Sequence, residues 1–275
     1  MGIMDGKKGI IFGVSNKFGI ANAIAEQIYK EGGEIAFTYA NEAMEKRVRP
    51  IADSMNAKLC LECDVTKDED VKKVFEEYAK TYDRLDFVIH AVAFANKEDL
   101  MGDFYTTSRE GWDLAMHVSA YSLLTMSKYA KPQMELTGGG SILALTYLGS
   151  TKAVANYNIM GVAKAALESS MRFIAADLGK YNIRCNCLSA GPVKTMAAKG
   201  IGGFDRMLKA NILKAPLKRT PSLEDVGKAG LYLASDLSSG VTGEVHFVDC
   251  GAHSVFASLD EMELMCQSQK ETANV

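Results

Sequence analysis

The chain has 275 residues, a formal net charge of −3, 48% hydrophobic residues and 24% charged residues. This composition supplies enough apolar material for a core and excludes extended disorder. The small negative charge provides no global attraction for nucleic acid or anionic lipid, so we expect neither as a partner. No apolar run approaches the ~18 residues that cross a bilayer, and the N-terminus lacks a signal-peptide pattern, so we expect a cytoplasmic protein without membrane contact.

Cysteine and histidine spacing indicates no metal site. Six cysteines in 275 residues are too sparse for a disulfide scaffold, and the four histidines show no ligand spacing. Cys60 and Cys63 have C-x-x-C spacing, but they lie in an alternating, strand-like run. Residues three apart on a strand face opposite sides, so the pair is not expected to share a ligand.

The elements in chain order alternate between strands and helices. Short β-rich apolar runs predict strands at about 9–13, 34–39, 58–63, 85–91, 141–146, 184–190 and 245–249. Helical patterns separate them, beginning with the apolar series from Ile20 to Ile28 and continuing at about 108–129, 156–178 and 223–234. The alternation predicts a single-domain, Rossmann-like α/β fold over 1–275. Its doubly wound sheet would have about seven parallel strands, with helices on both faces.

The residues that follow the first expected strand form a glycine-bearing turn into a helix. This turn runs from Gly13 to Ile20, where backbone N–H groups and the helix dipole are suited to a pyrophosphate. The spacing is not G-x-G-x-x-G, because five residues separate Gly13 from Gly19, so glycines that serve packing alone are the alternative. The βαβ context favours dinucleotide binding.

The ends of the next three strands concern the adenosine half of such a cofactor. The second strand ends at Ala40 without an acid or an arginine, which mildly favours NADH over NADPH, although Lys46 and Arg47 lie nearby. Asp64 follows the third strand, where its carboxylate suits an adenine amino group; a cap or turn residue is the alternative. The fourth strand ends at Ala91, which begins a run of small residues that a cofactor can approach, although core packing explains the run equally well.

The most informative region follows the fifth strand. Tyr157 and Lys164 are seven positions apart on a helical pattern, so both side chains point the same way, and Tyr147 ends the strand before them. An ammonium beside a phenol lowers the pKa of the phenol, which suits a tyrosine that stabilises a developing oxyanion. Two other tyrosine–lysine pairs have this spacing, and a core tyrosine with an exposed lysine is the alternative.

The segment after the sixth strand predicts a substrate cover. Gly191–Pro192 is suited to a nicotinamide carboxamide and Thr195 to a phosphate oxygen, with a rigid exit turn as the alternative. Apolar residues between glycines predict a lid at about 194–212, although a short core helix also fits them. Seven basic residues against one acid over 194–219 form either a local positive patch for an acidic partner or a solvated face. The polar tail after about 258 is loosely held or used in subunit contact.

These residues resemble the bacterial enoyl-acyl-carrier-protein reductases, a divergent family of short-chain dehydrogenases/reductases whose active site uses Tyr-x6-Lys. The similarity covers nearly the whole chain and is most specific at 146–149, 156–164 and 189–192. The resemblance implies hydride transfer from NADH to the β-carbon of a trans-2-enoyl thioester carried by acyl carrier protein. It also implies a homotetramer, with Tyr157, Lys164 and Tyr147 as the catalytic residues.

The resemblance assigns further site residues. Tyr157 would stabilise the enolate oxygen, either directly or through the cofactor ribose. Lys164 would hold the nicotinamide ribose, and Tyr147 would line the acyl pocket. The expected cofactor residues are Gly13, Ser15, Gly19 and Ile20 at the pyrophosphate, Asp64 and Val65 at the adenine, Ala91 alongside, and Val193 and Thr195 at the nicotinamide end. The expected substrate residues are Tyr147, Tyr157, Met160, Ala197 and Phe204.

Two other functions fit parts of the pattern. The nearer alternative is another short-chain dehydrogenase that acts on a ketone or an enoyl-coenzyme A. None of the 11 tyrosines has a lysine four positions on, which counts against a ketoreductase. The second alternative is a non-catalytic dinucleotide sensor, for which a tyrosine and lysine beside the nicotinamide are unnecessary.

Overall fold

A parallel β-sheet is the centre of the protein. The structure, a computed structural model, describes residues 2–193, 204–257 and 262. Its seven strands are all parallel, in the order β3-β2-β1-β4-β5-β6-β7. The predicted doubly wound fold is therefore confirmed. The strands are β1 (Lys8–Phe12), β2 (Glu34–Tyr39), β3 (Cys60–Glu62), β4 (Phe87–His90), β5 (Gly140–Thr146), β6 (Ile183–Ala190) and β7 (Val245–Val248).

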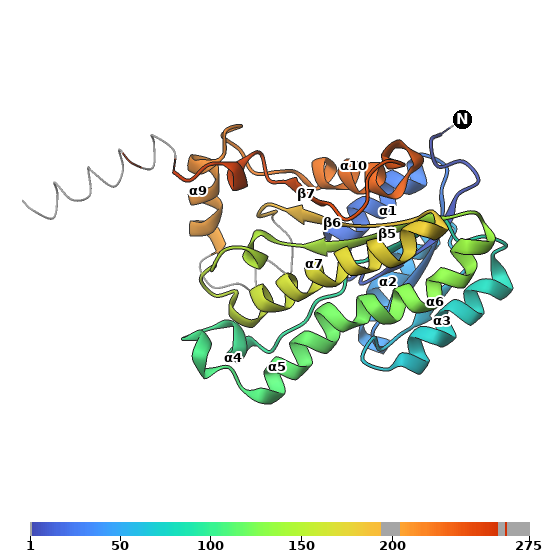
Figure 1. Ribbon diagram of the computed structural model, residues 1–275, viewed down its shortest axis with the longest axis horizontal. Helices are drawn as coiled ribbons and strands as arrows, with labels where there is room; N and C mark the ends of the chain where they lie inside the picture. The colour runs from blue at the N-terminus through green and yellow to red at the C-terminus, as the bar shows by residue number, and fades with distance from the viewer. Residues whose placement is uncertain (1, 194–203, 258–261, 263–275) are drawn as a thin grey trace, which may run out of the picture.

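Helices cover both faces of this sheet (Figure 1). One face is covered by α1 (Ile20–Lys30), α2 (Glu42–Ser54) and α10 (Leu223–Ala234), and the other by α3 (Asp68–Thr81), α6 (Ser122–Leu136) and α7 (Asn158–Leu178). The remaining described α-helices are α4 (Lys97–Leu100), α5 (Arg109–Met116) and α9 (Phe204–Lys214).

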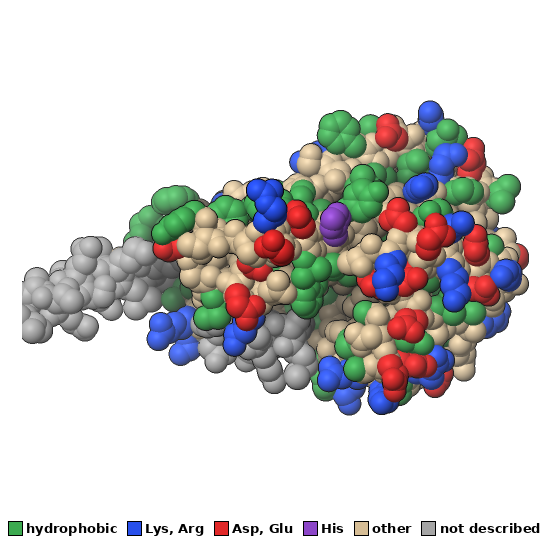
Figure 2. All heavy atoms as spheres, turned by 90° about the horizontal axis from the view of Figure 1, so that it is seen from below, with side chains coloured by type: hydrophobic (Ala, Val, Ile, Leu, Met, Phe, Trp, Pro, Cys, Tyr) green, Lys and Arg blue, Asp and Glu red, His purple; other side chains and the backbone are tan. Residues whose placement is uncertain are grey.

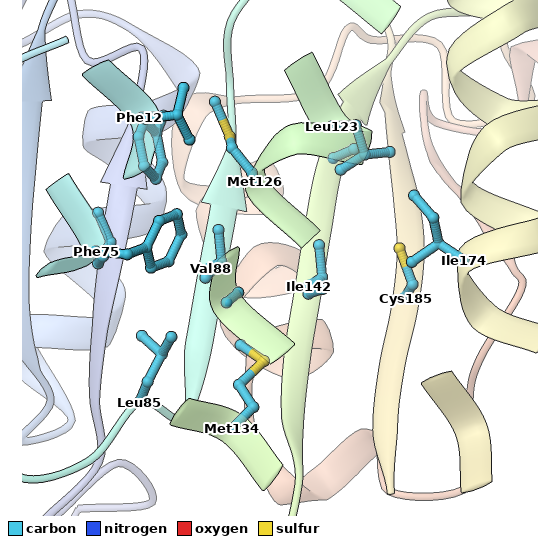
Figure 3. Close-up of a cluster of buried hydrophobic side chains, with 14 of the residues drawn as sticks. Phe12, Phe75, Leu85, Val88, Leu123, Met126, Met134, Ile142, Ile174 and Cys185 are labelled. Atoms are coloured by element: carbon cyan, nitrogen blue, oxygen red, sulfur yellow. The ribbon is translucent and has the colours of Figure 1, made fainter. Parts of the chain in front are cut away.

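Aligned strand residues build the core between the sheet and its helices. Val88, Ile142 and Cys185 are register partners on β4, β5 and β6, so their side chains form a row on one face. All three are fully buried. Figure 3 shows this row beneath side chains from the covering helices, among them Phe75, Leu123, Met126 and Ile174. Burial on both faces explains why the strands read as continuous apolar runs.

The strand order reverses between β1 and β4. The chain builds β2 and β3 outward from β1, then crosses to β4 on the other side of β1 and continues to β7. In such sheets the ligand crevice lies beyond the carboxyl ends of the strands at this reversal. The loops after β1, β4, β5 and β6 therefore form the expected site.

One predicted helix is interrupted. The expected helix at about 108–129 consists of α5, a π-helical turn at His117–Tyr121, and α6. The hydroxyl of Ser122 bonds back to the carbonyl of Val118 at 2.7 Å and lies 2.7 Å from Nε2 of the fully buried His90. These bonds accompany the extra residue in the turn, which periodicity alone does not predict.

The C-x-x-C pair is divided between the two faces of the sheet. Cys63 is buried in the core cluster under α3 and α6, whereas Cys60 packs against the cluster under α1 and α2. Burial raises the pKa of the Cys60 thiol to about 11 and that of the Cys63 thiol to about 12. Neither is therefore a reactive thiolate at neutral pH. The placement of the two side chains on opposite faces is the one that the alternation along the strand predicts.

The surface carries both signs of charge. Figure 2 shows acidic and basic side chains interspersed on one face, with hydrophobic side chains among them. Attraction for a charged partner on that face is therefore local rather than global. Within the described part of the chain, every helix is too short or too polar to span a bilayer.

Candidate active site

Two adjoining cavities lie at the carboxyl ends of the central strands. The larger, about 300 Å³, is lined by Tyr147, Tyr157 and Lys164, among others. The smaller, about 150 Å³, is lined by the turn after β1. Both are lined by Ile20, Ala91 and Leu145, so they form one continuous crevice.

The turn after β1 is built for a close approach of backbone. Gly13 has a φ of +91°, and a Cβ there would lie 2.3 Å from the carbonyl oxygen of Ala91, so only glycine fits. Gly19 caps α1 without a side-chain acceptor, whereas Asn41 caps α2 with its own side-chain oxygen. The first N–H groups of α1 are therefore left for a ligand. Ser15 lines the same cavity, so this turn fits the pyrophosphate of a dinucleotide.

Tyr157 lies immediately before α7. It is the N-cap residue of that helix rather than part of its first turn, and it is half-buried. Its ring meets that of Tyr147 edge-on, with centroids 4.9 Å apart and planes at 70°. Gly149 also lies against the Tyr157 ring, since a Cβ at Gly149 would be only 2.6 Å from Cδ1 of that ring. The tyrosine is thus held by a second tyrosine and a glycine.

Lys164 reaches the same cavity from the second turn of α7. Its side chain is only 5% exposed, and Nζ donates a hydrogen bond of 2.7 Å to the carbonyl of Leu145 at the end of β5. Burial lowers the pKa of Lys164 to about 8, so the amine remains mostly protonated at neutral pH. The predicted convergence of Tyr157 and Lys164 is present, since both line one cavity.

The expected lowering of the tyrosine pKa is wrong. Burial raises the pKa of Tyr157, and the neighbouring Tyr147 and Glu168 raise it further. Burial also raises the pKa of Tyr147. The ammonium of Lys164 is directed to Leu145, and desolvation dominates at the phenol. Tyr157 is therefore a neutral hydroxyl at physiological pH, suited to donate a hydrogen bond.

The other predicted residues are divided between the crevice and its surroundings. Met160 and Val193 line the larger cavity. Oδ1 of Asp64 accepts hydrogen bonds from the N–H and hydroxyl of Thr66, in the turn geometry that was the alternative. Val65 packs partly buried against the core. Thr195, Ala197 and the side chain of Phe204 lie outside the described part of the chain.

Some site residues were not assigned from the sequence. Leu145 acts through its backbone carbonyl, which carries no side-chain signal. Met207 of α9 was expected as an apolar residue of the lid, but its contact with Tyr147 was not: its sulfur accepts a bond of 3.5 Å from the hydroxyl of that tyrosine. Val154 lines the larger cavity without belonging to a recognisable pattern. Gly149 belongs to one of the quoted motifs, but its role emerges only from its contact with Tyr157.

Comparison with known proteins gives one consistent family. The family described as "Enoyl-(Acyl carrier protein) reductase" matches residues 13–253. The NADH enoyl-[acyl-carrier-protein] reductase of Rickettsia prowazekii is 47% identical over 94% of this chain and 98% of its own. A crystal structure of the Anaplasma phagocytophilum reductase in complex with NAD has a TM-score of 0.89 and 47% identity, covering 94% of this chain and 98% of that one. The Bacillus cereus reductase, solved with NADP+ and an indole naphthyridinone, has a TM-score of 0.89 and 45% identity, covering 93% and 99%.

The fold and the crevice define a nicotinamide-dependent oxidoreductase of the short-chain dehydrogenase/reductase class. Its turn after β1 is suited to a dinucleotide, and its tyrosine and lysine line the larger of the two adjoining cavities. Within that class, the chain belongs to the family of NADH-dependent enoyl-[acyl-carrier-protein] reductases.

Proposed function

We propose that this protein reduces the carbon–carbon double bond of a trans-2-enoyl thioester on acyl carrier protein, the last reductive step of a fatty-acid elongation cycle. The observation that carries the proposal is the shared cavity of Tyr157 and Lys164, which continues into the turn after β1. When bound in the crevice, NADH would supply the hydride for the β-carbon, and a proton would then be added at the α-carbon. The relatives' names support both the cofactor and the substrate.

Tyr157 and Lys164 divide the chemistry. The neutral hydroxyl of Tyr157 donates a hydrogen bond to the thioester oxygen as negative charge develops there. Lys164 holds the ribose hydroxyls and contributes positive potential, and its bond to the Leu145 carbonyl fixes the position of the amine beside the cavity. Tyr147 lines the acyl side and supports the Tyr157 ring edge-on.

The remaining cofactor contacts follow the crevice. Gly13, Ser15, Gly19 and Ile20 bind the pyrophosphate, Asp64 and Val65 the adenine, Ala91 the adjacent backbone, and Val193 and Thr195 the nicotinamide end. NADH is preferred over NADPH. The acidic Glu42 in the first turn of α2 repels the 2′-phosphate of NADPH. Glu42 also pairs with Lys46 at 3.3 Å, and this ion pair weakens the attraction between Lys46 and a 2′-phosphate.

The acyl chain occupies the apolar side of the larger cavity. Met160 and Tyr147 line it, and Ala197 and Phe204 complete it from the segment at about 194–212, which serves as a lid within a single-domain chain. The contact between Met207 and Tyr147 supports this role, because it joins α9 to the site. A flexible thioether is suited to a surface that adapts to chains of different length.

Acyl carrier protein approaches from the α9 side. Arg206 and Lys209 are exposed and three positions apart on α9, so they share one face next to the cavity. An acidic carrier is attracted to this local positive surface even though the whole protein is weakly acidic. Arg219, by contrast, is paired with Asp225 at 2.6 Å and contributes less.

The protein assembles as a homotetramer in the bacterial cytoplasm, where NADH and acyl carrier protein meet. A tetramer with two-fold symmetry needs at least two separate self-complementary surfaces. One is the side of α6 and α7, where Leu124 is 39% and Phe173 is 72% exposed. The other is the open edge strand β7, whose residues are all partly exposed. Exposed apolar side chains and an unpaired edge both favour burial against a second copy.

The test is turnover with defined thioesters and two matched variants. Nicotinamide absorbance should fall with NADH and enoyl-carrier-protein substrates, but not with a β-ketoacyl thioester. Tyr157→Phe should lower kcat and retain NADH affinity, because it removes only the hydroxyl. Lys164→Ala should weaken NADH binding. Turnover of the ketoacyl substrate alone would overturn the reaction, and unchanged NADH binding in the lysine variant would overturn the division of roles.

A further inference from the structure

A buried carboxylate lies directly behind the proposed catalytic pair. Glu168 is one helical turn beyond Lys164 on α7, so the two side chains share a face of the helix. Both are only 5% exposed. A carboxylate buried this far needs a hydrogen-bond donor to offset its lost hydration. The proposed roles of Tyr157 and Lys164 do not by themselves explain a buried carboxylate at residue 168.

The donor is the last residue of β5. Thr146 is 6% exposed, and its hydroxyl donates a hydrogen bond of 2.5 Å to Oε1 of Glu168. The residues on either side of Thr146 also meet the catalytic pair. The carbonyl of Leu145 accepts the bond from Lys164, and the ring of Tyr147 packs on Tyr157. Three consecutive residues of β5 and its exit thus contact the α7 region, and the Thr146–Glu168 bond is the middle contact.

The same carboxylate acts on the charge of the site. Burial lowers the pKa of Lys164 to about 8, and Cys187 and the negative charge of Glu168 both act in the opposite direction. The charge of Glu168 also adds to the burial that raises the pKa of Tyr157. Both effects favour the protonated forms that the proposed mechanism uses, the ammonium of Lys164 and the neutral hydroxyl of Tyr157. The amine binds Leu145 and the carboxylate binds Thr146, so the two charges interact through space.

The other titratable groups around Lys164 do not replace this charge. Burial lowers the pKa of His90 on β4 to about 3 and raises that of Cys187 on β6 well above its usual value, so both are neutral near pH 7. Tyr147 and Tyr157 are neutral as well, because burial raises the pKa of each. Arg172, one turn beyond Glu168 on α7, is exposed and carries a positive charge. Glu168 is therefore the carboxylate among the described groups that act on Lys164.

We propose that Glu168 is a positioning residue for this reaction: anchored by Thr146, it holds the end of β5 against α7 and places a negative charge one helical turn from the buried Lys164 ammonium. The proposal rests on the proposed role of Lys164 in binding the cofactor. It predicts two separable effects. Loss of the charge changes the pH dependence of NADH binding, and loss of the anchor changes turnover.

The first test measures the Kd of NADH by its fluorescence between pH 6 and 9.5. In the wild type, affinity should weaken as pH rises through the pKa of Lys164, near 8. Glu168→Gln keeps the size and an acceptor oxygen for Thr146 but removes the charge. Its midpoint should move to lower pH by about 1 unit. Asp177→Asn removes an equal charge from an exposed position of α7 and should leave the midpoint in place.

The second test uses Thr146→Val, which keeps the shape of the side chain and removes the donor. We expect kcat to fall by about tenfold with a smaller change in the Kd of NADH at pH 6.5, since a misplaced site loses turnover first. If Glu168→Gln folds poorly, Thr146→Val still tests the positioning role of Glu168. An unchanged midpoint in Glu168→Gln, or unchanged kcat in Thr146→Val, overturns the proposal. If Lys164→Ala itself leaves NADH binding unaltered, it is the proposed role of Lys164 that fails.

Discussion

Gly149 offers a direct test of how tightly Tyr157 must be held. An alanine Cβ at this position would lie 2.6 Å from Cδ1 and 2.8 Å from Cε1 of the Tyr157 ring, whereas ordinary contact begins at 3.4 Å. Gly149 does not have a positive φ, so alanine adds no backbone strain. The ring must move by about 1 Å to restore normal carbon–carbon contact. A displacement of that size at a reacting group costs about 10²-fold in rate.

The assay compares Gly149→Ala with a matched control. Gly179, at the other end of α7, has open space where its Cβ would be and a helical φ of −58°. Gly179→Ala should therefore leave kcat unchanged and leave stability equal or slightly higher. For Gly149→Ala we expect kcat to fall by about 10²-fold in the enoyl-thioester assay, with the Kd of NADH changed much less.

A double variant shows whether the effect passes through the tyrosine. In a Tyr157→Phe background the hydroxyl is already absent, so adding Gly149→Ala should lower kcat far less than it does in the wild type. Additive losses would place the effect elsewhere. If Gly149→Ala retained kcat within about twofold of wild type, the reasoning from ring contact to rate would be refuted.

Three further predictions concern the surface and the core. Reversing the charges of Arg206 and Lys209 should raise KM for carrier-protein substrates about tenfold more than for short soluble thioesters, and equal effects would leave them as ordinary surface. Phe173→Asp should convert the proposed tetramer into smaller species in light scattering, and an unchanged mass would exclude that surface from the interface. In the folded protein the pKa of His90 is about 3, below its unfolded value of about 6.5. Above about pH 6.5 the residue is neutral in both states, so its protonation does not lower the free energy of unfolding. As pH falls from there toward 3, the unfolded state binds the extra proton, and stability should decline by up to about 1.4 kcal/mol per pH unit. Urea unfolding at several pH values should show a shallower decline for His90→Asn; parallel curves would contradict the assignment.

Local patterns predict several elements closely. The helix expected at 223–234 is α10, because Ser222 and Asp225 form both hydrogen bonds of a capping box at its start. The alternation around Cys60 and Cys63 correctly separates their two faces. These features depend on residues a few positions apart, so their physical causes are present in the local sequence.

Features that depend on distant segments are harder to predict. The π-helical turn before α6 accompanies a contact between Ser122 and His90, which are 32 positions apart. The orientation of Lys164 depends on a backbone carbonyl of β5, and the pKa of Tyr157 depends on how completely neighbouring segments exclude water. Spacing places a phenol and an ammonium on one side of a helix, but it contains no information about desolvation.

From its residues alone the chain specifies alternating strands and helices, a glycine-bearing turn suited to phosphate, and a tyrosine and lysine with the spacing of one reductase family, because periodicity, glycine placement and residue chemistry are local properties. Folding adds the crevice between β1 and β4 and the contact of Gly149 with Tyr157. It also adds the buried Thr146–Glu168 bond. These arise only when separate strands and helices pack together, since close packing and the loss of water around a charge depend on every segment that surrounds it.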